Sequence, residues 1–284
     1  MEPRIRRFFT ALHEGWTGSA LPEAGTGPAS AEHFDTFERL ARDWSVSPLE
    51  AGLRLLSKRE GNGPPIRDST HELGPLDLAC DHPALRGRGL EPNLCRDREI
   101  GLVSEANNPH AGWLAVTVFD ILGRRVGWTY RRLEADQEPA RPSRGGRPPA
   151  RWSISPSFPR GRHLYNLDRA WPSLVSTETA IVVEGPFDAL HLHRSGWPNT
   201  VALLGNRLTG WHVDLLLTVG VSAIVLLLDN DHGGRQGRHW ALKTDARLSQ
   251  FRVIDLSSAL PPGQDPDDLT REALPAVLGP YKPA

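Results

Sequence analysis

The sequence contains little cysteine, little lysine and no long apolar run, and each shortage excludes a class of protein. Among its 284 residues only Cys80 and Cys95 are cysteines, and they form no C-x-x-C pair. A structural zinc site built on four cysteines is therefore excluded, and we expect no zinc cofactor. Buried free thiols are the simplest prediction for both residues.

The chain has three lysines, and none of them follows a glycine. A Gly-Lys phosphate-binding loop is thus absent, and with it a fused helicase motor of that type. No apolar run approaches the ~20 residues of a membrane-spanning helix. Residues 1–15 carry basic charge but lack the continuous apolar segment of a signal peptide. These absences predict a cytoplasmic protein with no membrane partner.

What is present is the composition of a folded globular protein, with 39% hydrophobic and 24% charged residues. The length accommodates two modest domains and a small extension. Helical spacing of apolar residues predicts a helical N-terminal module over residues 1–60. We expect a basic subdomain over residues 61–172 and an α/β domain over residues 173–284.

Arginine supplies nearly all of the positive charge, and it is concentrated in the middle of the chain. Residues 124–169 contain eleven arginines and four acidic residues, although the net charge of the whole chain is −1. Such a stretch creates a local positive field that attracts phosphates. Within it, alternating apolar residues predict a β-hairpin over residues 114–133, and residues 134–149 are expected to form an exposed basic loop. Trp128 and Trp152 lie near these arginines and are candidates for stacking on bases, although packing is the simpler role for each.

From residue 180 onward, short apolar runs alternate with amphipathic helical segments. The runs AIVV (180–183), VALL (201–204), AIVLLL (223–228) and RVIDL (252–256) are almost continuously apolar, as in strands covered on both faces. Helices are expected around residues 188–194, 209–219 and 234–248, with Gly196 and Gly220 ending the first two. The alternation predicts a parallel α/β sheet.

Acidic residues follow three of these runs, at the sheet edge where ligands bind in open parallel sheets. Carboxylates brought together there would repel one another unless cations lie between them. Oxygen ligands without histidine or cysteine favour Mg²⁺ or Mn²⁺ over zinc. The candidate metal ligands are Glu184, Asp188, Asp229, Asp231, Asp265 and Asp267.

Four motifs follow one another along this part of the chain: VVEGPFDAL, VALLGNRLT, VLLLDNDHGGRQGRHWA and GQDPDDL. In their order and spacing they resemble the Toprim domain of DnaG-type bacterial and phage primases. Three upstream segments resemble the basic half of the same primase core: LGRRVGWTYRRL, RWSISPSF and RGRHLYNLDRA. Residues 82–102 resemble the helix that opens this core. The resemblance covers about residues 81–278. It implies a parallel-sheet Toprim domain preceded by a mixed α+β basic subdomain and a small helical extension.

The resemblance also implies roles for individual residues. Glu184 would be a general base or metal ligand, and Asp229 and Asp231 would complete the catalytic set. Glycines at positions 205 and 234 would allow a phosphate backbone to approach closely. We expect nucleotide or nucleic-acid contacts from Arg124, Arg125, Arg131, Arg151, Arg160, Arg162, Gly205 and Gly234.

The function expected is a primase-like nucleotidyltransferase that makes or extends short RNA on single-stranded DNA from NTPs. Because the cysteines of the family's zinc-binding module are missing, residues 1–60 are a candidate degenerate remnant of it. A replicative helicase or a separate zinc-binding protein is then the expected partner. Two alternatives remain. One is a Toprim nuclease of a mobile element or defence system, but the upstream basic motifs argue against it. The other is a non-catalytic nucleic-acid binder, but the intact acids argue against that.

Overall fold

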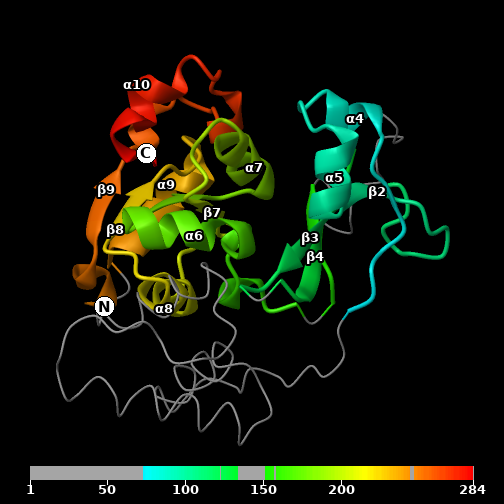
Figure 1. Cartoon of the computed structure of the whole chain (residues 1–284), viewed down its shortest axis with the longest axis horizontal. Helices are drawn as coiled ribbons and strands as arrows, with labels where there is room; N and C mark the ends of the chain where they lie inside the picture. Colours follow the sequence, from blue (N-terminus) through cyan, green and yellow to red (C-terminus); the bar gives the residue numbers. More distant parts are fainter. Residues whose placement is uncertain (1–72, 122, 134–150, 157, 244–245, 284) are drawn as a thin grey trace, which may run out of the picture.

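The computed structural model describes residues 73–121, 123–133, 151–156, 158–243 and 246–283. The helical module expected over residues 1–60 and the basic loop expected over residues 134–149 lie outside these residues. Figure 1 shows the parallel sheet and its helices on one side of the molecule, and an antiparallel sheet with α4 (Pro83–Arg86) and α5 (Pro92–Arg98) on the other.

The antiparallel sheet has the strand order β1-β2-β3-β4-β5. The predicted hairpin is present as β3 and β4, and its turn is closed by the amide of Asp120, which donates to the carbonyl oxygen of Arg124 over 2.9 Å. β5 is an edge strand that pairs only with β4 among the described residues. The strands are β1 (Leu78–Ala79), β2 (Ile100–Val103), β3 (Leu114–Phe119), β4 (Arg125–Arg131) and β5 (Trp152–Ile154).

The single opening helix expected within residues 82–102 is wrong, because the chain forms two short helices there. These are α4 (Pro83–Arg86) and α5 (Pro92–Arg98), and the remaining residues enter β2. Gly89 between them has a φ of 66°, a left-handed conformation that favours glycine and interrupts a helix. Pro92 lies in the first turn of the second helix, where proline is tolerated.

The predicted parallel sheet is present, with the strand order β7-β6-β8-β9 and every pairing parallel. Gly196 and Gly220 follow the last turns of α7 and α8 with φ of 101° and 93°, as helix-ending glycines do. The strands are β6 (Thr179–Val183), β7 (Thr200–Ala202), β8 (Ala223–Leu226) and β9 (Arg252–Asp255). The helices are α6 (Leu167–Thr177), α7 (Pro186–Arg194), α8 (Gly210–Thr218) and α9 (His232–Lys243).

Short helical turns complete the described chain and join the sheets to the C-terminus. The helix predicted over residues 234–248 is wrong in its bounds, since α9 begins at His232 and a separate 3₁₀ turn follows. Among the described residues, no helix is long and apolar enough to cross a membrane. The remaining elements are η1 (Arg160–Arg162), η2 (Ala246–Gln250), η3 (Ser257–Ala259), η4 (Pro266–Asp268), α10 (Leu274–Leu278) and η5 (Gly279–Tyr281).

Side chains of β6 alternate between two apolar cores, which confirms that this strand is covered on both faces. Ile181 and Val183 lie in one cluster, whereas Ala180 and Val182 lie in the other. The first cluster also contains Leu114 of β3 and other residues of the antiparallel half. A continuous core therefore joins the two halves, as expected for the α/β fold class with its mixed basic subdomain.

Candidate active site

The first two candidate acids lie where β6 leads into α7: Glu184 in the connecting loop and Asp188 in the first turn of α7. The amide of Gly185 donates to Oδ2 of Asp188 over 2.9 Å, which closes the first turn of α7. The other carboxylate oxygen accepts from the amide of Asp267 over 3.2 Å, so Asp188 joins this loop to η4. Asp188 is only 6% exposed. Burial, followed by the negative charges of Asp267 and Asp265, raises the pKa of Asp188 well above its usual range.

The second pair of acids follows β8 but does not lie on a strand. β8 ends at Leu226, and Asp229 and Asp231 occupy the loop that leads into α9. Because both acids follow the apolar run 223–228 closely, the sequence predicts that they project from the end of the strand on one face. This prediction is wrong, since the strand ends before Leu227. Asp231 is exposed and its Oδ1 accepts from the amide of Gly234 over 2.7 Å, as an N-cap residue does. The side chain of Asp229, in contrast, is partly buried.

Among the exposed and half-buried acids, the carboxyl group of Asp229 has the most strongly raised pKa. Burial, and then the charges of Asp188, Glu184, Asp265 and Asp231, raise its pKa from 3.8 to about 9. Its Oδ1 is buried and has no hydrogen-bond partner within the part of the chain that the structure describes. An unsatisfied buried oxygen surrounded by other carboxylates fits a site for a divalent cation, which would remove the repulsion.

A close contact brings Glu184, Asp229 and the first turn of α9 together. A Cβ atom on Gly234 would lie 1.8 Å from the carbonyl oxygen of Asp229 and 2.9 Å from Oε1 of Glu184. No residue other than glycine fits at this position without displacing the backbone. The candidate catalytic acids Glu184 and Asp229 therefore approach α9 from two different loops.

The third acidic loop is tied to the second by backbone hydrogen bonds. The amide of Asn230 donates to the carbonyl of Gln264 over 3.0 Å, and Gly263 donates back to the carbonyl of Asn230 over 2.8 Å. Asp268, which belongs to the GQDPDDL motif but was not a candidate ligand, accepts from the amide of Asp265 over 3.0 Å. The pKa of Asp265 is raised by burial and then by the charges of Asp267, Asp268 and Asp231.

The six predicted acids thus lie in the three segments that follow β6, β8 and β9, at the same edge of the parallel sheet, but their side chains do not form a finished metal site. Among the described residues, no three His, Cys, Asp or Glu side chains are grouped so that they could hold a metal ion. Asp188 and Asp231 instead accept hydrogen bonds from backbone amides. Side-chain rearrangement would be required for several of them to bind one ion together.

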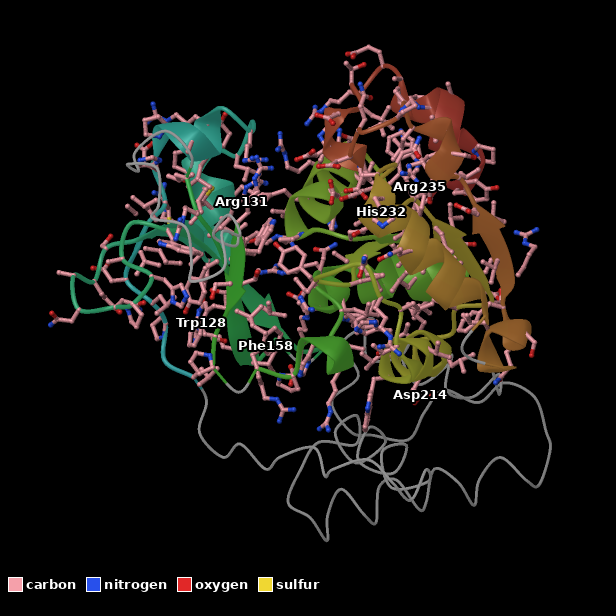
Figure 2. The ribbon with its side chains drawn as sticks, turned by 180° about the vertical axis from the view of Figure 1, so that it is seen from behind. Trp128, Arg131, Phe158, Asp214, His232 and Arg235 are labelled. Carbon is pink, nitrogen blue, oxygen red and sulfur yellow. The ribbon has the colours of Figure 1, made fainter. Side chains whose placement is uncertain are left out.

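Two arginines of the antiparallel half lie against the acidic loops. Arg88 forms an ion pair with Asp267 over 3.3 Å, and its guanidinium lies 4.8 Å from the centre of the Phe187 ring. Arg131 lies 5.8 Å from the same ring and 5.4 Å from the centre of the Trp152 ring. Figure 2 shows Arg131 on the side of its sheet that faces the parallel half. Neither Arg88 nor Phe187 was predicted from the sequence, because only the packing of the halves brings them together.

The other predicted arginines are more widely distributed. Arg124 pairs with Asp120 over 2.7 Å at the hairpin turn, and Nε of Arg125 donates to Glu99 over 2.7 Å. Arg160 is exposed and donates to the carbonyl of Leu204 over 3.3 Å. Its guanidinium lies beside Gly205, where a Cβ atom would be 3.4 Å from Nη1. Arg151 is exposed, and Arg162 lies 5.1 Å from the ring centre of Trp211 on α8.

The two cysteines are free thiols, as predicted, and differ in burial. Cys95 is buried and Cys80 is partly buried. Burial raises the pKa of Cys95 to about 11, which disfavours the thiolate that a metal ligand requires.

Comparison with known proteins identifies the part of the chain that carries the first four candidate acids. Residues 178–254 match the family model of the Toprim domain. The DNA primase of Deinococcus radiodurans is 33% identical over 186 residues, which make up 60% of this chain and 29% of that protein. The DNA primase of Synechococcus elongatus is 32% identical over 185 residues, 60% of this chain and 24% of that protein. The matched region thus spans less than a third of the length of these relatives.

Solved structures give the same fold. A structure of the Aquifex aeolicus primase with its zinc-binding and RNA polymerase domains has a TM-score of 0.57 at 19% identity, and the match covers 98% of this chain and 84% of that one. A DNA primase domain from Pseudomonas aeruginosa has a TM-score of 0.53 at 23% identity, with 83% and 78% covered. A DnaG primase catalytic domain bound to single-stranded DNA has a TM-score of 0.53 at 22% identity, with 89% and 83% covered.

Proposed function

We propose that this chain, which carries a Toprim domain and is a homologue of bacterial DNA primases, is a metal-dependent nucleotidyltransferase. It would make or extend short RNA primers on single-stranded DNA. The observation that supports this most strongly is the approach of arginines from the antiparallel half to the acidic loops of the parallel half. A nucleotide at such a boundary would meet both a cation site and positive charge for its phosphates.

Asp229, Asp231 and Glu184 are the residues proposed to hold Mg²⁺ or Mn²⁺. The raised pKa of Asp229 and its unsatisfied buried oxygen support this assignment, since an added cation would favour the ionised carboxylate. When bound, the cation would supply charge stabilisation for the attacking and leaving oxygens of nucleotidyl transfer. Asp188 has a different proposed role: its two backbone hydrogen bonds would hold the β6–α7 loop and η4 in place.

The protein's own groups would orient the substrates. Arg131 and Arg88 lie close enough to the acidic loops to bind phosphates that approach them. Arg160, exposed beside Gly205, is a further candidate for a phosphate of the template or nucleotide. Glu184 would accept the proton of the attacking hydroxyl or act as a ligand. The proposed substrates are NTPs and single-stranded DNA, and the proposed partners remain a helicase or a separate zinc-binding protein.

The test is an assay with single-stranded DNA, labelled NTPs and either Mg²⁺ or Mn²⁺. The proposal predicts labelled RNA that grows with time and is lost in Asp229→Asn. Asp97→Asn is the matched control, because Asp97 is an exposed acid paired with Arg169 away from the site, and this variant should retain the product. Shortened DNA would instead identify a nuclease that uses the same acids. DNA binding without either product would identify a non-catalytic binder.

A further inference from the structure

One aromatic side chain beside the candidate site is exposed where packing would normally cover it. Trp152 and Ile154 of β5 are the large hydrophobic residues that remain exposed among those described, each at 37%. Burial of apolar surface is favourable, so a tryptophan left partly in water at a sheet edge forgoes part of that stabilisation. Such a position is common for residues that contact a ligand.

The register of the sheet shows which way this tryptophan faces. Trp152 pairs with Arg131, and Arg131 pairs in turn with Leu114. Residues paired across antiparallel strands share a face, and Leu114 lies in the core that joins the two halves. Trp152 is therefore at the open edge of the face that packs against the parallel half.

Contacts place this edge directly beside the acidic loops. The Trp152 ring lies 5.9 Å from the Phe187 ring at an interplanar angle of 40°. Phe187 is buried in the first turn of α7, between the candidate acids Glu184 and Asp188 in sequence. The guanidinium of Arg131 lies over both rings. Phe187 and Arg131 thus hold one side of the indole while the rest of it stays exposed.

We propose that Trp152, with Ile154 beside it and Arg131 next to it, is a stacking platform for one nucleobase. The proposal rests on the proposed function, because it places that base next to the site of nucleotidyl transfer. The base belongs either to the NTP or to the single-stranded template, and both present the same flat aromatic surface. Arg131 provides positive charge close to the stacked base, which complements the phosphate that every nucleotide carries.

The test compares Trp152→Leu, which removes the aromatic surface but keeps an apolar side chain, with Trp152→Phe, which keeps a ring. Binding is measured without turnover by titrating four probes: oligothymidylate, an abasic oligonucleotide of the same length, ATP, and inorganic tripolyphosphate. Loss of one stacked base should weaken binding about 5- to 150-fold. Circular dichroism and melting curves establish that each variant is folded.

We expect Trp152→Leu to weaken binding of oligothymidylate or of ATP, whichever supplies the base, while Trp152→Phe retains most of it. Both variants should bind the abasic oligonucleotide and tripolyphosphate as tightly as the unmodified protein does. The dependence of oligonucleotide affinity on salt should also be unchanged, since no phosphate contact is lost. Loss for oligothymidylate alone identifies the template, and loss for ATP alone identifies the nucleotide.

The platform is overturned if Trp152→Leu binds all four probes as tightly as the unmodified protein does. It is also overturned if affinity for the abasic oligonucleotide and tripolyphosphate falls as much as affinity for oligothymidylate and ATP. A loss in Trp152→Phe as large as that in Trp152→Leu would also overturn it. These outcomes are independent of RNA synthesis. If the stacking result holds but no RNA is made, the proposed function fails and the platform stands.

Discussion

Gly234 lies so close to Asp229 that a Cβ atom added to it would be 1.8 Å from the Asp229 carbonyl oxygen. Its neighbour Gly233 has a different environment, where the nearest atom to an added Cβ would be Oδ1 of Asp231 at 3.3 Å. Both glycines lie in the first turn of α9. The acidic loop and the helix therefore pack through Gly234, and this packing sets the position of Asp229.

This difference predicts that two adjacent substitutions affect stability to very different extents. Gly234→Ala forces the backbone of the loop or of α9 to move and should lower the free energy of unfolding by about 1–3 kcal/mol or more. Gly233→Ala should change it by less than about 0.5 kcal/mol, because a side-chain oxygen can shift and alanine favours the helix. Chemical denaturation of both variants measures the difference. Equal stability of the two would mean that α9 does not pack against Asp229 in this way.

The arginines predict a graded effect of salt on binding to single-stranded DNA. Removing two phosphate contacts should reduce the slope of log affinity against log salt by about 1.4. We expect this for Arg131→Gln combined with Arg160→Gln, since both lie beside the candidate site. Arg124→Gln combined with Arg125→Gln is the matched control.

The control also removes two positive charges, but Arg124 and Arg125 already pair with Asp120 and Glu99. The salt slope should therefore change little. A larger change in the control pair than in the first pair would place the nucleic-acid surface at the hairpin turn instead. Affinity at four or more salt concentrations, measured by fluorescence anisotropy, decides between them.

The sequence predicted the strands of the parallel sheet well but not where they end. Residues 227 and 228 are leucines and continue the apolar run of residues 223–226, so the sequence predicts a longer β8. In the structure the amide of Leu228 donates to the side-chain oxygen of Ser257 rather than to a neighbouring strand. A hydrogen bond to a residue almost thirty positions away leaves no local signal in the sequence. The prediction that Asp229 and Asp231 project together from the strand end failed for this reason.

The candidate acids could be found from their positions after strands, because parallel strands end at one edge of a sheet. The sequence could not show which of them accept backbone hydrogen bonds, since aspartate is favoured both at helix N-termini and as a ligand of hard cations. Arg88 and Phe187 were missed because their contacts form between the two halves. Trp152 was recognised only as one of two candidates for base stacking, and its exposure depends on β5 being at the sheet edge.

A buried histidine at the start of α8 predicts a loss of stability in acid. His212 is fully buried, and its Nδ1 accepts from the amide of Thr209 over 3.2 Å. Burial lowers the pKa of His212 from 6.5 to about 4. Because this pKa is lower in the folded than in the unfolded state, neutral His212 contributes fully to the free energy of unfolding above pH 6.5. The contribution is lost as the pH falls from 6.5 towards 4.

His212→Gln should keep the cap, because glutamine at this helix position can also accept from the amide of the N-cap residue. The unmodified protein should lose about 2 kcal/mol more than this variant between pH 7 and pH 5. Urea unfolding at both pH values measures the difference. An identical loss in the two proteins would show that protonation of His212 is not linked to unfolding.

The final prediction concerns the charge of Asp229 and Asp231. Asp→Asn at both positions keeps size and polarity but removes two negative charges, so it should weaken Mg²⁺ binding and abolish turnover while the fold survives. Without metal, the double variant should melt at or slightly above the temperature of the unmodified protein, because carboxylate repulsion is relieved. Mg²⁺ at about a hundred times its Kd should raise the melting temperature of the unmodified protein by roughly 5 to 10 °C, and that of the variant much less. Asp81→Asn combined with Asp97→Asn removes two charges from exposed ion pairs with Arg86 and Arg169 and should keep the full shift. If the Asp229 and Asp231 variant shifted as much as this control, cation binding would have to be assigned to other residues, and the proposed nucleotidyl transfer would lose its chemical basis.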